Sequence, residues 1–186
     1  MRRIAVLALL PLLLAACNNA AEAPEAAETA AAAPAADLML DLQATGIVVP
    51  AQGGAEQLDI PFGSARAAAE ATIASVAGAV ENRGENAECG AGPMQMTEYA
   101  RLTLNFQDDK FVGWFARAPY VPELPRAEML ADPAVALVNG STLGEEFTIG
   151  AISGNPAAPI ISGLFANAED TAAVEALWAG TNCLFR

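Results

Sequence analysis

The 186-residue chain is acidic, with 22 aspartate and glutamate residues against 9 lysine and arginine residues and a formal net charge of −13. This balance leaves no basic patch for a phosphate backbone, so we expect no nucleic-acid partner. The chain contains no histidine, which excludes Ser-His-Asp and Cys-His catalysis and the commonest zinc ligand. Glycine-rich phosphate-binding motifs are also missing from the sequence, so we predict neither a metal site nor a cofactor.

The N-terminal stretch is predicted to be a lipoprotein signal peptide. Arg2 and Arg3 precede an apolar run at residues 4–14, which is too short to span a bilayer and is typical of a signal peptide. The run leads into Leu-Ala-Ala-Cys17, which resembles the lipobox of bacterial lipoproteins. The resemblance implies that residues 1–16 are removed and that Cys17 carries the lipid, palmitate included, that anchors the protein to a membrane. Asn18 stands where some bacteria place the aspartate of inner-membrane retention, which favours the outer membrane, facing the periplasm.

Residues 17–36 are predicted to be a disordered tether after the lipidated cysteine. They are rich in alanine, glutamate and proline and hold no large apolar side chain, so they cannot bury enough surface to offset the entropy of folding. Residues 37–186 carry large apolar residues throughout and have the length of one domain. We expect a single periplasmic domain there.

Two cysteines remain once Cys17 is lipidated. Cys89 and Cys183 both follow the signal peptide, in a compartment where disulfides persist. An even remainder favours a Cys89–Cys183 disulfide. The alternative is a pair of separate buried thiols that behave as small apolar side chains.

The first part of the domain alternates between apolar and polar residues, which predicts short strands at 38–42, 46–50 and 58–62. Ser64 is a plausible N-cap for the helix that follows. Its apolar face is formed at helical spacing by Ala65, Ala69, Ile73, Val76 and Val80. Gly78 and the polar run at residues 81–88 are expected to close this helix.

The second part continues with a turn at residues 89–93 and a strong hairpin at 101–115. A short helix is expected at 126–131 and strands at 135–138 and 146–149. A final strand pair is expected at 160–165 and 174–178. The fold class is therefore α+β, an antiparallel sheet with one main helix. Because both parts end in a strand, an acidic turn and a strand with a tryptophan, two βαββ-like halves are one interpretation, and chance similarity of two hairpins is the other.

Three motifs carry a resemblance. Phe-Gly-Ser at 62–64, Cys-Gly-Ala-Gly-Pro at 89–93 and Phe-Val-Gly-Trp at 111–114 look like those of uncharacterised bacterial envelope lipoproteins. The outline is also similar to half-domains of the β-lactamase-inhibitor-protein-like fold and to the accessory lipoprotein of the β-barrel assembly machinery. The resemblance covers residues 58–115 well and the rest loosely, and it implies protein binding. The polar run at 81–88 and the paired cysteines depart from the assembly lipoprotein, so its particular role is not transferred.

Three groups of residues are candidates for chemistry or binding. Asp108-Asp109 lies between two strands and is interpreted as a turn rather than a cation site. Glu145 and Glu146 are adjacent on an extended segment and therefore point to opposite faces, which disfavours a glycosidase-like carboxylate pair. An exposed binding surface is one interpretation of four aromatic residues, Trp114, Phe115, Tyr120 and Trp178, but a place in the core is favoured for the two tryptophans.

We therefore expect a non-enzymatic, lipid-anchored envelope protein that binds or helps to assemble another envelope protein. The lack of catalytic side chains, the anchor and the resemblance all favour this class. The alternative is a cell-wall glycan hydrolase that works through carboxylates alone, with Glu145 or Glu146 as its acid or base.

Overall fold

The computed structural model describes residues 39–51, 53–150 and 158–184. By its internal contacts the chain divides into two units, Met1–Ala35 and Ala36–Arg186, and every helix and strand given below belongs to the second. The predicted signal peptide at 1–16, the predicted lipid site Cys17 and the tether at 17–36 lie outside the described residues.

A three-stranded antiparallel sheet opens the described part of the chain. Its strands are β1 (Asp41–Gln43), β2 (Gly46–Val49) and β3 (Leu58–Pro61), in the order β1-β2-β3. The alternation of the sequence orients them, because Ile47, Val49 and Ile60 are all buried on one face. The strands expected at 46–50 and 58–62 are confirmed, whereas the first strand spans 41–43 instead of the expected 38–42.

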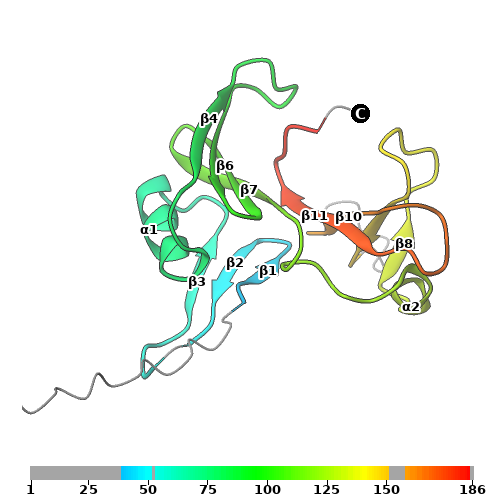
Figure 1. Cartoon of the computed structure of the whole chain (residues 1–186). Coiled ribbons are helices and arrows are strands. Elements are labelled where there is room, and N and C mark those ends of the chain that lie inside the picture. The colour runs from blue at the N-terminus through cyan, green and yellow to red at the C-terminus, as the bar shows by residue number, and fades with distance from the viewer. Residues whose placement is uncertain (1–38, 52, 151–157, 185–186) are drawn as a thin grey trace, which may run out of the picture. The chain divides into compact units, whose positions relative to one another are not determined.

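The larger sheet has eight strands in the order β4-β5-β6-β7-β11-β10-β9-β8, and all of its pairs are antiparallel (Figure 1). Its strands are β4 (Asn82–Asn86), β5 (Met94–Tyr99), β6 (Leu102–Gln107), β7 (Lys110–Ala116), β8 (Val135–Leu137), β9 (Glu146–Ile149), β10 (Ile161–Phe165) and β11 (Val174–Gly180). The helices are α1 (Arg66–Ala77) and α2 (Arg126–Ala131). The α+β class with one main helix is confirmed.

The eight-stranded sheet is built from two similar halves. In the first half α1 precedes the four consecutive strands β4 to β7, and in the second half α2 precedes β8 to β11. Each half thus contains one helix and a four-strand meander, which is a longer unit than the βαββ outline expected from the sequence. The halves join where β7 pairs with β11, the last strand of each.

The register of this central pair relates the halves by a pseudo-two-fold axis. Phe115 faces Trp178, with Trp114 opposite Ala179 on one side and Ala116 opposite Leu177 on the other. A rotation about the Phe115–Trp178 pair exchanges these two flanking pairs. The halves are therefore equivalent in strand order and in the positions of their central residues.

Helix α1 begins one residue later than expected and ends before Gly78, as expected. Ala65 occupies the N-cap position without a side-chain cap, while Ser64 Oγ donates a hydrogen bond to the Pro61 carbonyl at 2.7 Å. The polar run expected to close the helix contains β4. This strand lies at the edge of the sheet, where exposed charged side chains are favoured and an apolar alternation is not required.

The hairpin of β6 and β7 is confirmed, and Asp108-Asp109 forms its turn. Both residues have positive φ, at 49° and 56°, as a two-residue turn of the type favoured in hairpins requires. Aspartate tolerates this backbone conformation better than most residues. The turn interpretation of the two carboxylates is therefore confirmed.

The two faces of the eight-stranded sheet have different neighbours. Trp114 and Leu104 lie on what we call the covered face, and they belong to the core that also includes Ile73 of α1 and Ile47 of the small sheet. The opposite side, the aromatic face, carries Phe115 and Trp178. Both helices and the small sheet contribute to the core on the covered face. Within the described part of the chain, the aromatic face has no such cover from a helix, and its side chains are therefore the candidates for binding.

Candidate functional site

The structure separates the four aromatic residues that the sequence offered as a surface. Trp114 is fully buried, and its Nε1 donates a hydrogen bond to the Gln43 carbonyl at 2.9 Å. The surface interpretation is therefore wrong for Trp114, because its strand position turns it toward the small sheet. Tyr120 is half-buried and packs against the same core. Phe115 and Trp178 alone of the four lie on the aromatic face.

Phe115 and Trp178 form a stacked pair at the centre of the aromatic face. Their ring centroids are 6.2 Å apart and their planes differ by 16°. The guanidinium of Arg117 lies 5.4 Å from the centroid of Phe115 and pairs with Glu175 at 2.9 Å. Phe115 is half-buried, whereas Trp178 is only 5 % exposed. In this pair, the ring of Phe115 is partly accessible to solvent and the ring of Trp178 is buried.

Each ring of the pair lines a different cavity. Phe115 lines a cavity of about 230 Å³ together with Met96, Glu98, Thr103, Asn105, Asn182, Cys183 and Leu184. Trp178 lines one of about 650 Å³ together with Ala44, Thr45, Pro61, Phe62, Pro159, Ile160, Ser162, Ala179 and Gly180. The larger volume falls in the range of small-molecule and side-chain pockets. Its wall contains no charged residue, which suits an apolar or aromatic group.

Residues 181–184, which we call the C-terminal strap, form one wall of the smaller cavity. Thr181 N donates to the Val112 carbonyl at 2.8 Å, and Asn105 Nδ2 donates to Asn182 Oδ1 at 2.7 Å. Gly113 permits this close approach, because a Cβ there would collide with the backbone of Thr181. The strap therefore crosses the aromatic face beside Phe115.

The strap also brings the two predicted disulfide partners together. Asn86 Nδ2 donates a hydrogen bond to Cys183 Sγ at 3.2 Å. A hydrogen bond with the Cys89 side chain raises the pKa of Cys183. Cys89 is buried and Cys183 is half-buried, and both are free thiols in the structure. The two side chains are adjacent although 93 residues separate them in the sequence.

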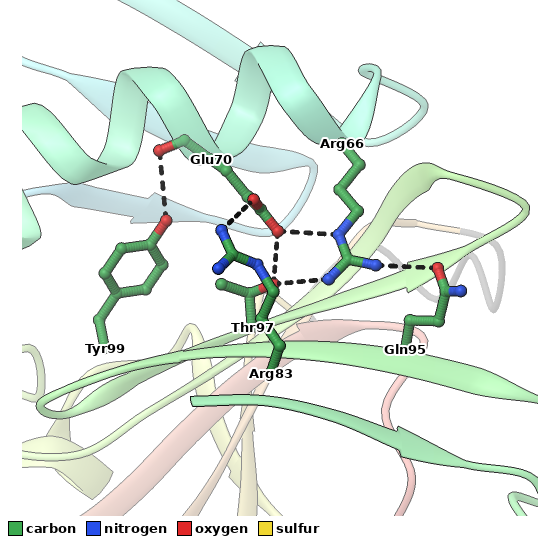
Figure 2. A network of polar contacts seen from close by, with 6 residues as sticks. All are labelled: Arg66, Glu70, Arg83, Gln95, Thr97 and Tyr99. Atoms are coloured by element: carbon green, nitrogen blue, oxygen red, sulfur yellow. Dashed lines mark hydrogen bonds and ion pairs between the residues drawn. The ribbon is translucent and has the colours of Figure 1, made fainter. Parts of the chain in front are cut away.

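A second polar site, shown in Figure 2, joins α1 to the first half of the sheet. Glu70 on the helix accepts hydrogen bonds from Arg66 at 2.8 Å and Arg83 at 2.7 Å, and from the Thr97 hydroxyl at 2.6 Å. Arg66 also donates to Gln95 at 3.0 Å and lies 5.0 Å from the Phe106 ring centroid. Apart from the Arg66–Glu70 pair within α1, the dashed contacts in the figure link α1 to strands β4 and β5, and one of them runs from the Tyr99 hydroxyl to the Glu70 backbone carbonyl. This network braces the helix on the sheet.

The electrostatics of Glu70 agree with a bracing role. Burial acts to raise the pKa of Glu70, but hydrogen bonds from Arg83, Thr97 and Arg66 outweigh it and lower the pKa from 4.5 to about 2. The carboxylate therefore stays ionised and saturated with donors at neutral pH. A general acid or base needs a pKa nearer the working pH and a free coordination site, so this arrangement is suited to stability rather than catalysis.

The second half contains a similar set of contacts around Arg126, and these contacts account for the position of Glu145. Arg126 begins α2 as Arg66 begins α1, and its guanidinium lies 5.9 Å from the Phe165 ring centroid. Arg126 Nη2 donates a hydrogen bond to Glu145 Oε2 at 3.1 Å. Glu145 accepts the amide of Phe165 through its carbonyl, just as Gln95 lies opposite Phe106 in the first half. Glu145 is thus the counterpart of Gln95.

The predicted divergence of Glu145 and Glu146 is consistent with their different partners. Glu145 pairs with Arg126, while Glu146 is 2 % exposed and accepts a hydrogen bond from the Ser141 hydroxyl at 2.6 Å. Both residues line a polar cavity of about 240 Å³ beside the 138–144 loop. Each carboxylate is therefore occupied by an internal donor.

No family model, curated protein or solved structure matches this chain. Within the described ranges, no helix is long and apolar enough to cross a bilayer. Among those same residues, no group of three or more histidine, cysteine, aspartate or glutamate side chains is placed to hold a metal ion. The site must therefore be interpreted from its own geometry.

Sequence reasoning missed several of the residues that build these sites. Arg83 and Thr97 lie on β4 and β5, neither of which was expected as a strand. The available signal for β5 was the sequence Met94–Tyr99, in which side chains of two kinds alternate as they do along a strand. The strap left no such signal, because its position depends on a contact with Gly113 across the sheet.

Proposed function

We propose that this protein is a lipid-anchored binding module of the bacterial cell envelope that recognises an apolar or aromatic segment of another envelope protein. The observation that carries the proposal is the stacked pair of Phe115 and Trp178, in which each ring lines a different cavity. Aromatic residues beside apolar cavities are typical anchors of protein interfaces. The partner contributes apolar groups, because the larger cavity offers no charge to pair with.

The proposed location follows from the N-terminal sequence. Leu-Ala-Ala-Cys17 after an apolar run supports acylation of Cys17, and Asn18 supports the outer membrane with the domain in the periplasm. A polar tether of residues 18–36 would reach roughly 25 Å on average. The binding face can then meet partners held in the envelope layer above the membrane.

A non-enzymatic role fits the described charged groups better than the hydrolase alternative does. Glu70 and Glu145 each pair with arginine, and Glu146 accepts a serine hydroxyl. A glycosidase requires two carboxyl groups that face a shared substrate cleft. The contacts of these three glutamates instead support roles in holding helices and loops.

Site-specific photocrosslinking in cells tests the proposal. A benzoylphenylalanine at Thr103, which lines the smaller cavity, is compared with one at Ala71, an exposed residue of α1. We expect one protein adduct from position 103 only, and we expect Phe115→Ala to abolish it. Equal adducts from both positions, or adducts only with glycan strands, would contradict the proposal.

The anchor is tested separately by labelling with a fatty acid. Palmitate should be incorporated into the wild-type chain and not into Cys17→Ala, which should also leave the membrane fraction. Incorporation that persists in Cys17→Ala would refute lipidation at this residue. The crosslinking result would be unaffected.

A further inference from the structure

We propose that a disulfide between Cys89 and Cys183 locks the C-terminal strap over the cavity beside Phe115, and that reduction of this bond releases the strap and uncovers the cavity. The strap would then regulate the binding face proposed above. This regulatory role rests on the proposed binding function. The locking itself is a property of the isolated protein.

The strap is held firmly at its start and weakly at its end. Thr181 N bonds to the Val112 carbonyl. Beyond it, Asn182 bonds to the Asn105 side chain and to the Ala179 carbonyl, and the Cys183 sulfur contacts the side chains of Asn86 and Cys89 and the backbone of Gly90. A covalent bond at residue 183 would therefore supply the main constraint where backbone pairing has ended.

The position of the strap makes its release consequential. Asn182, Cys183 and Leu184 line the same cavity as Phe115 and Thr103. All four strap residues are half-buried, so they exclude solvent from this part of the aromatic face. When the strap leaves, the ring of Phe115 and the Met96 side chain lose one of their covering walls.

Formation of the bond requires an external disulfide that acts as the oxidant. Oxidation breaks the two S–H bonds, forms one Sγ–Sγ bond and removes two electrons and two protons. An external disulfide, such as that of a thiol oxidant of the periplasm, accepts them and becomes two thiols. In the reverse step a dithiol attacks the bond and is itself oxidised. Cys183 is the accessible member of the pair, because Cys89 is only 7 % exposed.

Hydrogen exchange on the natural lipidated protein tests the lock. The chain is extracted from membranes under alkylating conditions and its free thiols are counted. Exchange in the peptide covering residues 178–184 is then compared before and after reduction. We expect no free thiol at positions 89 and 183, and at least tenfold faster exchange at 181–184 after reduction, with β6 unchanged. Two alkylated cysteines in the extracted protein, or equal exchange in both states, would overturn the proposal.

A pair of glycine variants provides an independent measurement. Gly113→Ala places a Cβ against the Thr181 backbone, whereas Gly84→Ala meets only the Met96 methyl group at 3.4 Å. We expect the first variant to increase strap exchange and to slow disulfide formation, and the second to behave as wild type. If Gly113→Ala does not fold, the reduction of the wild-type chain still decides the question.

The two proposals fail in distinguishable ways. Strap exchange is measured without a partner, so a missing adduct at position 103 would leave the lock intact. Conversely, an adduct of equal yield in oxidised and reduced cells, together with an immobile strap, would remove the regulation and keep the binding function.

Discussion

Phe115 and Trp178 occupy equivalent positions in the two halves of the sheet and stack on each other across the strand pair that joins those halves. The pseudo-two-fold axis passes through this pair. The two positions differ in the size of the ring and in its surroundings. Phe115 faces the strap, whereas Trp178 faces the larger cavity. A symmetric fold thus presents an asymmetric face.

The aromatic pair should contribute unequally to stability. Trp178→Ala removes a buried side chain and should lower the free energy of unfolding by about 3–5 kcal/mol. Phe115→Ala removes a half-buried ring and should cost about 1–2 kcal/mol. Urea denaturation measures both, with the exposed Leu124 replaced by alanine as the control. Equal losses would show that the two rings are equally anchored, contrary to their exposures.

Glu70 should make stability depend on acidic pH. Its pKa is about 2 in the folded protein and 4.5 ordinarily, so ionisation stabilises the fold above about pH 4.5. This contribution is lost as the pH falls through about 2. Glu70→Gln should therefore cost on the order of 2 kcal/mol at pH 7 and almost nothing at pH 2.

Glu175→Gln is the matched control for this experiment. Glu175 also pairs with an arginine, but both side chains are more than two-fifths exposed, at 44 % and 46 %. Its loss should cost under about 0.5 kcal/mol at either pH. Urea titrations at the two pH values would contradict the prediction if both variants lost stability in parallel.

Arg126 lacks a contact that its counterpart has. Arg66 Nε bonds to Glu70 four residues later, whereas Leu130 stands four residues after Arg126, and Arg126 Nε is buried without a hydrogen-bond partner among the described residues. Leu130→Glu should restore the pair. It should be more stable than Leu130→Gln by about 1 kcal/mol at pH 7, and the difference should vanish below about pH 3. A glutamine variant as stable as the glutamate variant would disprove the correspondence.

Glu145 should tolerate an amide but not a truncation. Gln95 makes the corresponding contact to Arg66 through an uncharged oxygen, so Glu145→Gln should lose less than about 1 kcal/mol. Glu145→Ala leaves the 14 % exposed Arg126 with Asp170 at 3.8 Å, and should cost about 1–3 kcal/mol. Thermal unfolding compares the two variants. An amide variant as damaged as the alanine variant would indicate that the charge itself is required.

The turn at Asp108-Asp109 should be sensitive to side-chain shape. Asp109 has φ of 56°, so Asp109→Val should cost about 1–2 kcal/mol, since a β-branched residue is strained there. Asp109→Gly should stay within about 0.5 kcal/mol of wild type. Chemical denaturation checks both, and equal stability of the two variants would argue against the left-handed turn.

Many of the helices and strands were predictable because residues close together in the sequence determine them. The hairpin of β6 and β7, the helix α1, the short helix α2 and strands β8 to β11 follow from apolar periodicity and turn residues in short windows. These features need only neighbours in sequence.

The sequence by itself determined which segments become helix and strand wherever one face must be buried, and it supplied the residues of the candidate lipid site and cysteine pair. Only the tertiary structure decided that the polar run becomes β4, that Trp114 is core while Phe115 and Trp178 form a pair, and that Cys183 lies beside Cys89. These outcomes depend on contacts between segments far apart in the chain. Local alternation orients a strand but does not choose its partner, and strand pairing determined where those side chains meet.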